Sequence, residues 1–287
     1  MKYLRAQTVE EALQALTAAA GAAKVIAGGT DLMIDLEEGK IAADILVDVS
    51  QIPGLTEIQL ENNKIIIGCG VTHTMTARSE IVRQGAPALA EACGTVGSLQ
   101  IRNIAAVIGN VANGQPAADA AVALAALGAE CRVVNANGYR NIPMAEMYAG
   151  FGKSIVDSRR EIITQLEVPY QQKGEAGAFI RLELRKSLAL PMLNVAAMVH
   201  LEENVVQWSR ITMAPVGIGP VRATAAEQWL QGKVFDTANR QKAAALVVED
   251  ANPRSNPLRG SREYRLETLP VLAERALVSI AAQLGVA

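Results

Sequence analysis

The chain has 287 residues, of which 50% are hydrophobic and only 3% aromatic, so its core must be built mainly from Ala, Val, Ile and Leu. Its 27 basic and 29 acidic residues leave a net charge of −2, which gives no field for binding nucleic acid or an acidic membrane surface. No apolar stretch is long enough to span a bilayer and the N-terminus lacks the apolar region of a signal peptide, so we expect a cytoplasmic location.

The cysteine and histidine content bears on metal chemistry. Three cysteines, Cys69, Cys93 and Cys131, stand far apart in the sequence, which favours reduced thiols buried as small apolar side chains over a disulfide framework. Iron–sulfur clusters need several closely spaced thiolates, so we expect none in this chain. His73 and His200 have no Cys or His at ligand spacing, which disfavours a zinc site.

The first 55 residues carry alternating helix and strand signals. Thr8-Val-Glu-Glu11 is a capping box, in which the hydroxyl and the carboxylate satisfy opposite backbone donors, so a helix is predicted to begin there. Its inward-facing residues are expected to be Val9, Leu13 and Leu16. Strands are predicted over 24–27 and 45–49. Between them a helix is predicted over 31–38, with the Asp31 carboxylate near its positive end and Gly39 as its stop.

From about residue 56 the pattern indicates a longer unit. Strands are predicted over 64–68, 130–135 and 161–168, and helices over 72–82 and 87–96 and from residue 117. The polar tract over 170–177 indicates a linker. Beyond it, strands over 178–183, 193–202 and 205–214 precede helices that start near residues 223, 239 and 262, which is typical of a separate α+β unit. Pro220-Val-Arg222 with Glu227 is interpreted as a helix start.

Two glycine motifs stand out as candidate binding loops. Backbone N–H groups can bind a pyrophosphate only where no side chain intervenes, which is why glycine suits such a contact. In the first motif Gly28 and Gly29 meet this requirement, and Thr30 adds a hydroxyl donor. The second motif supplies Gly109, Asn110 and Asn113. Either motif alone could be a plain strand-to-helix turn, but two such turns facing each other could hold a diphosphate.

The order of these motifs resembles that of the flavoprotein subunit of molybdenum hydroxylases, the family of bacterial xanthine dehydrogenase FAD subunits and carbon monoxide dehydrogenase medium subunits. The resemblance runs from Ala27-Gly-Gly-Thr-Asp31 through Gln100-Ile-Arg-Asn103 to Pro220-Val-Arg222 and Glu263-Tyr-Arg265. It implies an α+β fold in two domains. A two-lobed, vanillyl-alcohol-oxidase-like (PCMH-type) FAD-binding domain would cover 1–172, with lobes of about 1–55 and 56–172, and a C-terminal domain of the carbon monoxide dehydrogenase flavoprotein type would cover 173–287.

The resemblance also implies a set of contacts to a non-covalently bound FAD. The implied residues are Val25, Ala27, Gly28, Gly29, Thr30, Asp31, Leu32, Ala106, Gly109, Asn110, Asn113, Asp119, Ile162, Ile163, Arg181 and Leu190. Asp119 would hydrogen-bond toward the ribityl or adenosine part of the flavin, although a residue near a helix start could equally serve as a cap or dipole partner. No catalytic side chain and no metal ligand are expected, because the flavin supplies the electron-transfer chemistry.

By the same resemblance, the chain is expected to work in a heteromeric complex. A large subunit would carry molybdopterin, a small subunit would carry 2Fe-2S clusters, and electrons would pass through FAD to NAD or another acceptor. Two alternatives remain open. One is a free-standing flavin oxidase of the same fold; such enzymes often tether FAD through His or Cys, and neither stands in the two motifs. The other is a scaffold subunit with weakened FAD binding.

Two positions depart from the family pattern. Ile108 stands where the family has the first of two glycines, and a positive φ would cost a β-branched residue about 1–3 kcal/mol. We therefore predict ordinary β-region dihedrals for Ile108 and a side chain turned into the core. Ala189 stands where an Asp is common, beside Leu190, which could cover a flavin face. Arg181 and Arg185 could place a cation near the ring or could pair with carboxylates such as Glu183.

Overall fold

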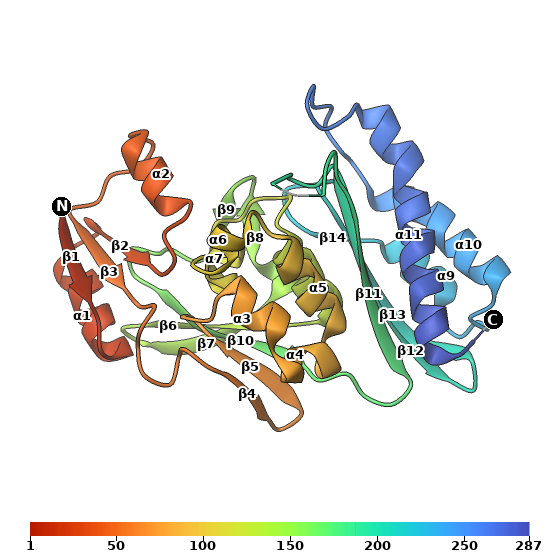
Figure 1. The fold of residues 1–287 in the computed structure, drawn as a ribbon, viewed down its shortest axis with the longest axis horizontal. Helices are drawn as coiled ribbons and strands as arrows, with labels where there is room; N and C mark the ends of the chain where they lie inside the picture. The colour runs from red at the N-terminus through yellow and green to blue at the C-terminus, as the bar shows by residue number, and fades with distance from the viewer. Residues whose placement is uncertain (187, 287) are drawn as a thin grey trace.

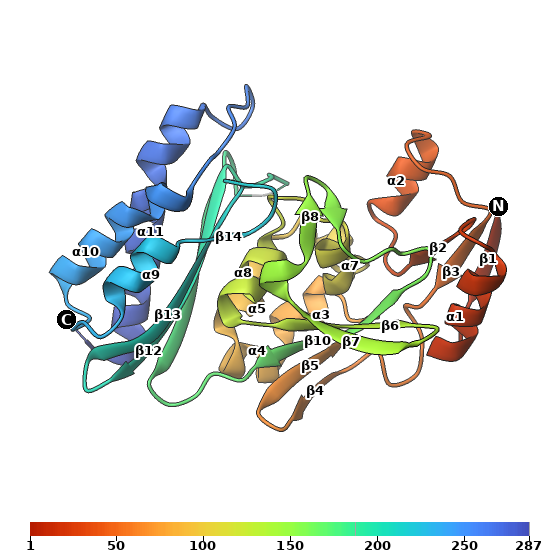
Figure 2. The ribbon, with the colours of Figure 1, turned by 180° about the vertical axis from the view of Figure 1, so that it is seen from behind.

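The computed structural model describes residues 1–186 and 188–286, and it arranges them in three successive units along one long axis. A small parallel sheet lies at the N-terminal end, an antiparallel sheet covered by helices lies in the middle, and a second antiparallel sheet backed by helices lies at the C-terminal end (Figure 1 and, from behind, Figure 2). This order follows the chain, so neighbouring units are joined by single crossings of the backbone.

The N-terminal unit is a three-stranded sheet in the order β1-β3-β2, with both pairs parallel. Its elements are β1 (Lys2–Arg5), α1 (Val9–Ala18), β2 (Ala23–Ile26), α2 (Leu32–Glu37) and β3 (Ile45–Asp48). The predicted capping box is confirmed: the Thr8 hydroxyl accepts from the Glu11 N–H at 3.1 Å, and the Glu11 carboxylate accepts from the Gln7 N–H at 2.7 Å. Strand β1 was not predicted, because its residues are mostly exposed and show no alternation of apolar side chains.

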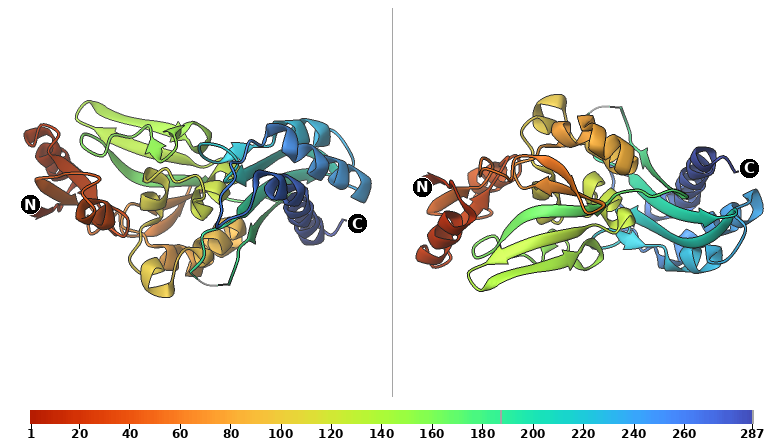
Figure 3. Two further views of the ribbon diagram at one scale, coloured as in Figure 1. Left: turned by 90° about the horizontal axis from the view of Figure 1, so that it is seen from above. Right: turned by 90° about the horizontal axis from the view of Figure 1, so that it is seen from below.

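The middle unit is a five-stranded antiparallel sheet in the order β4-β5-β10-β6-β7, with helices on one face and the other face uncovered (Figure 3). Its strands are β4 (Ile58–Glu61), β5 (Lys64–Gly68), β6 (Glu130–Asn135), β7 (Gly138–Pro143) and β10 (Ile162–Pro169). Its helices are α3 (His73–Arg78), α4 (Glu80–Gly85), α5 (Pro87–Thr95), α6 (Leu99–Arg102), α7 (Val107–Ala112) and α8 (Asp119–Leu127). A 3-10 turn η1 (Met144–Glu146) and the hairpin β8 (Tyr148–Gly150) and β9 (Lys153–Ser154) complete it.

The C-terminal unit is a four-stranded antiparallel sheet in the order β11-β12-β13-β14. Its elements are β11 (Glu175–Leu182), β12 (Leu193–Glu202), β13 (Val205–Ala214), β14 (Val221–Arg222), α9 (Thr224–Leu230), α10 (Thr237–Leu246), η2 (Val247–Asp250) and α11 (Arg262–Leu284). Alternate residues of β12 enter two different cores, as the two-residue period of a strand requires. Ala196 and Met198 pack into the core of the middle unit, whereas Val195, Ala197 and Val199 pack into the core under α11.

Three sequence-based boundaries need correction. The helix predicted over 72–82 is two helices, because Ser79 has extended dihedrals (φ −64°, ψ 126°) and its side chain caps α4 by accepting from the Val82 N–H. The linker predicted over 170–177 ends early, since β11 begins at Glu175. The helix start predicted at Pro220 is the short strand β14, and helix α9 begins at Thr224.

The buried side chains agree with the composition. All three cysteines are free and buried, as predicted, and burial raises the pKa of Cys69 and of Cys131 to about 12. Over residues 1–186 and 188–286, no helix combines the length and the apolar character needed to cross a membrane.

Candidate functional site

The first glycine motif is a tight turn from β2 into α2. Gly29 has a φ of +68°, in the left-handed region that side chains disfavour, and its carbonyl accepts from the Met33 N–H at 3.0 Å as the first bond of α2. Asp31 is the N-cap residue of α2, as expected, but its exposed carboxylate caps no N–H group. The backbone N–H groups that precede Met33 therefore have neither a carbonyl of α2 nor the Asp31 side chain as an acceptor.

The second motif is a pair of short helices and not the glycine turn that the sequence suggested. Helix α7 begins after Ala106, and Ile108 lies in its first turn, so the predicted β-region dihedrals are wrong. The steric reason behind the prediction still holds, because a right-handed helix also keeps φ negative. The Ile108 side chain is buried in the core, as predicted, and a Cβ added to Gly109 would meet no protein atom within 4 Å.

These two motifs lie directly against each other. A Cβ on Gly28 would stand 2.3 Å from the backbone oxygen of Ile104 and 2.8 Å from the Cα of Ala105, so only glycine allows this approach. The start of α7 is fixed from the other side as well. The Val107 N–H donates to the Val71 carbonyl at 3.1 Å, and the Ala105 carbonyl accepts from the His73 N–H at 3.1 Å.

The groups gathered at this junction suit a diphosphate. The N–H groups of Ile108 and Gly109 lie in the first turn of α7, where no carbonyl of the helix can accept from them. Gly109 leaves the space beside it open. The Oδ1 atom of Asn110 is buried without a hydrogen-bond partner among the described residues. Backbone donors and an open approach are the features that bind phosphate oxygens, whereas the Asn110 Oδ1 atom can accept from a hydroxyl group such as those of a ribityl or ribose unit, so the residues fit the predicted cofactor.

Asp119 lies at the first position of α8 and joins the middle unit to the C-terminal sheet. Its Oδ1 atom accepts from Asn194 Nδ2 at 2.8 Å and lies 3.2 Å from Arg181 Nε. Only 4% of Asp119 is exposed, and this burial raises the pKa of its carboxyl to about 6, although Arg181 and Asn194 act to lower it. Both partners come from the sheet of the C-terminal unit, so the carboxylate works across the boundary between the two cores.

Of the two alternatives predicted for Arg181, the structure shows the pairing with carboxylates. Its guanidinium contacts Glu183 and the Ala189 carbonyl in addition to Asp119. Arg185 donates to the Leu188 carbonyl at 2.5 Å, and the Leu190 side chain is exposed. Arg181 and Glu183 border a cleft of about 410 Å³ whose opposite wall is formed by residues between Gly94 and Arg102.

The other predicted site residues are placed as follows. Ile162 and Ile163 are buried core residues of β10, and Val25 lies in β2 with its N–H donating to the Ser158 carbonyl at 3.1 Å. Ala27 and Thr30 are half-buried in the first turn, Leu32 begins α2, and Asn113 ends α7. The contacts of all these residues with a cofactor stay predictions.

Sequence reasoning missed three residues that the structure places here. Asn194 interrupts an apolar strand, and a lone amide in such a run was the available signal. Glu183 was named only as a partner for arginines. His73 is buried, neither of its ring nitrogens has a hydrogen-bond partner among the described residues, and burial lowers its pKa to about 4.

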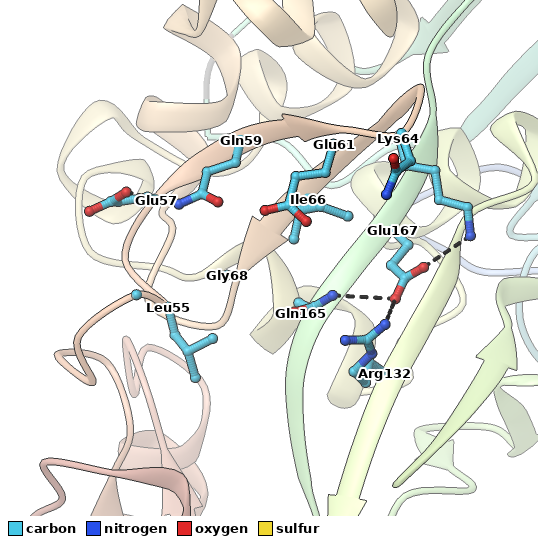
Figure 4. A pocket seen from close by; sticks show the side chains of 12 residues that line it. Leu55, Glu57, Gln59, Glu61, Lys64, Ile66, Gly68, Arg132, Gln165 and Glu167 are labelled. Atoms are coloured by element: carbon cyan, nitrogen blue, oxygen red, sulfur yellow. Dashed lines mark hydrogen bonds and ion pairs between the residues drawn. The ribbon is translucent and has the colours of Figure 1, made fainter.

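A second cleft, of about 370 Å³, lies on the uncovered face of the middle sheet (Figure 4). Glu167 at its centre is nearly buried and is held by Lys64 Nζ at 3.0 Å and by Arg132 at 2.6 Å. Burial acts to raise the pKa of Glu167, but the two cations together lower it. Glu57 and Glu61 also line this cleft, so it offers no excess of positive charge for a diphosphate.

Comparison with known proteins gives consistent matches along the chain. Residues 1–171 match the family described as the FAD binding domain in molybdopterin dehydrogenase, and residues 178–280 match the carbon monoxide dehydrogenase flavoprotein C-terminal domain. The putative xanthine dehydrogenase FAD-binding subunit of Escherichia coli is 28% identical over 99% of this chain and 97% of its own length. The alpha subunit of the 6-hydroxypseudooxynicotine dehydrogenase complex of Paenarthrobacter nicotinovorans is 30% identical over 96% and 92%. A solved structure of carbon monoxide dehydrogenase from Hydrogenophaga pseudoflava matches with a TM-score of 0.92 at 26% identity, covering 99% of this chain and 98% of that one.

Proposed function

This chain belongs to the family of FAD-binding subunits of molybdenum hydroxylases, and from that premise we propose that it carries FAD and transfers electrons within a heteromeric complex. A small subunit with 2Fe-2S clusters would deliver the electrons, and NAD or another acceptor would receive them. A large subunit with molybdopterin would oxidise the substrate. When bound, FAD supplies the redox chemistry that no side chain of this chain can supply.

The observation that carries this proposal is the junction of the two glycine motifs. Gly28 lets the backbone of Ile104 approach. This approach places the open first turn of helix α7 beside the first glycine motif. The N–H groups of Ile108 and Gly109 would hold the diphosphate, with the Thr30 hydroxyl as a further donor. The apolar, exposed Leu190 would cover part of the ring system.

The proposal includes non-covalent binding. The first motif and the segment from Ser98 to Asn113 contain no Cys and no His that could form a bond to the flavin. The three cysteines lie buried in the core, where burial raises their pKa and keeps the thiols protonated. Cysteines that stay reduced also suit a cytoplasmic location.

Exposed apolar side chains support the proposed partners. In Figure 1, helix α6 lies between helix α2 and the C-terminal end of strand β11. Large apolar side chains exposed on the two helices and after β11 are Met33, Ile34, Leu99, Ile101, Leu184, Leu188 and Leu190. Apolar surface gathered in this way marks a docking face, which we assign to the small iron–sulfur subunit.

Co-purification with this subunit tests the docking face. Ile34→Asp places a charge on the face and is expected to reduce the amount of iron–sulfur subunit recovered with the chain, without changing its FAD content. Leu60→Asp is the matched control, because Leu60 is equally exposed but lies on the edge strand β4. Equal recovery with both variants would place the docking face elsewhere.

The flavin itself distinguishes this function from the scaffold alternative. Purified wild-type protein is expected to show flavin absorbance and about one FAD per chain, whereas a scaffold subunit would show none. Gly109→Ala is expected to keep the fold and to lose FAD, because its new methyl group enters the space left open beside α7. If the complex contains FAD, its reoxidation by NAD, measured at the flavin absorbance, identifies or rejects NAD as the acceptor.

A further inference from the structure

One guanidinium group contacts a neighbouring carboxylate and two residues farther away in the chain. Arg181 Nε lies 3.2 Å from Asp119 Oδ1 at the start of α8, while the two terminal nitrogens contact Glu183 after β11 and the Ala189 carbonyl before β12. Its side chain is only 8% exposed. We propose that Arg181 is a positioning residue, which holds residues 188–192, the connection that leads into β12, at a fixed distance from the start of α8.

The charges around Arg181 favour this role over a direct electrostatic effect on a flavin. Two carboxylates, those of Asp119 and Glu183, face the single cation, so the group as a whole presents no net positive charge to its surroundings. A cation that tunes a redox group must keep its charge uncompensated. Arg181 therefore acts through the positions of the segments that it joins.

Arginine is suited to this task and lysine is not. Guanidinium carries five N–H donors in a rigid planar fork, so it can serve acceptors that lie in different directions. An ammonium group at the end of a flexible stem can reach one of these acceptors but cannot hold all three. Loss of the guanidinium would also leave the buried Asp119 carboxylate with Asn194 as its remaining hydrogen-bond donor.

The position of the connection matters because it borders the cleft near the proposed flavin site. Arg181, Glu183 and Leu188 line one wall of this cleft, and the segment from Gly94 to Arg102 lines the other. Ala189 has only a methyl side chain, so its attachment to Arg181 is made by its backbone carbonyl. The width of the cleft thus depends on an arginine that joins this wall to Asp119 in the middle unit.

Hydrogen exchange on the full-length chain without added FAD tests the proposal. The amide of Met192, which donates to the Leu182 carbonyl at 2.8 Å, is expected to exchange at least tenfold faster in Arg181→Lys and in Arg181→Met than in the wild type. Arg140→Lys is the matched control, because Arg140 pairs with Glu161 at an exposed site and its replacement should leave the exchange of this amide unchanged. Unchanged exchange in both Arg181 variants would overturn the proposal.

Two further measurements separate positioning from other roles. Asp119→Asn removes the charge from one of the three contacts, retains the shape of the side chain, and should give an intermediate acceleration even if Arg181→Met fails to fold. In FAD-loaded protein, Arg181→Lys should weaken FAD binding but leave the flavin midpoint potential unchanged, whereas a lowered potential in Arg181→Met with normal exchange would show an electrostatic role instead. This second readout rests on the proposed function, but the exchange measurement does not, so a chain that binds no FAD would fail only the second.

Discussion

Replacing Gly28 by alanine should destabilise the protein at the contact between its two binding motifs. The added Cβ would lie 2.3 Å from the Ile104 oxygen, which is far closer than van der Waals contact allows. The obstructing atoms belong to the backbone and cannot rotate away. The next residue, Ala105, is held by bonds from its own N–H to the Ile101 carbonyl at 2.7 Å and from the His73 N–H to its carbonyl at 3.1 Å.

The size of the effect follows from these contacts. Inserting a methyl group into a packed site costs about 1–3 kcal/mol, and loss of the bond between His73 and Ala105 adds about 1 kcal/mol. A total of about 2–4 kcal/mol corresponds to a fall in Tm of roughly 5–12 °C for a chain of this size. Urea unfolding of Gly28→Ala and wild-type chains, both without FAD, would measure this difference directly.

Gly109→Ala is the matched control, because it adds the same methyl group to the second motif. No protein atom lies within 4 Å of that Cβ, and alanine is favoured over glycine in a helix by about 1 kcal/mol, so the fold should be unchanged or slightly more stable. Its FAD dissociation constant, measured by flavin fluorescence, should nevertheless rise tenfold or more. Wild-type stability in Gly28→Ala would refute the packing argument, and wild-type FAD affinity in Gly109→Ala would refute the assignment of α7 to the diphosphate.

Three other outcomes follow from the buried ionisable groups and the proposed cofactor. Burial raises the pKa of Asp119 from 3.8 to about 6, and the groups that face its carboxyl are Arg181, Glu183, Cys93 and Asn194. Between these two pKa values the folded state binds more protons than the unfolded state. The free energy of unfolding should therefore fall by up to about 3 kcal/mol as the pH rises from 4 to 6. Urea titrations across this range should lose the slope in Asp119→Asn, and an identical slope would contradict the assignment. The three buried thiols should react with a thiol reagent only after denaturation, and reaction in the native state would show that the cores open readily. Acid precipitation should release all flavin into the supernatant, and flavin retained in the pellet would disprove non-covalent binding.

Elements with a strong local signal could be predicted from the sequence. The capping box at Thr8 fixes the start of α1, and the long apolar runs of β12 and β13 appear within the predicted ranges. Helix α11 also begins at Arg262 as expected, because Ser261 caps it by accepting from the Tyr264 N–H. In each case the residues that decide the element lie within a few positions of it.

The second binding motif could not be predicted because distant residues decide its structure. Val71 and His73 hold the segment around Ala106 by hydrogen bonds from more than thirty positions earlier, and helix α7 starts where these bonds end. The segment itself contains glycine and asparagine, which are typical of turns. Its residues stay a predicted site, and their helical conformation depends on tertiary contacts that the local sequence does not show.

Helix α8 connects the fold to the site. All nine of its residues are buried, because it packs against the middle unit on one side and against β12 and β13 on the other. The Thr212 hydroxyl donates to the Val122 carbonyl at 2.8 Å, so the C-terminal sheet is bonded to the helix itself. Asp119 is the only ionisable residue of α8, and it stands at the N-terminal end of the helix. Since both cores set the position of this carboxylate, and Arg181 joins it to the residues that line the cleft, the geometry of the proposed flavin site depends on how the two units pack together.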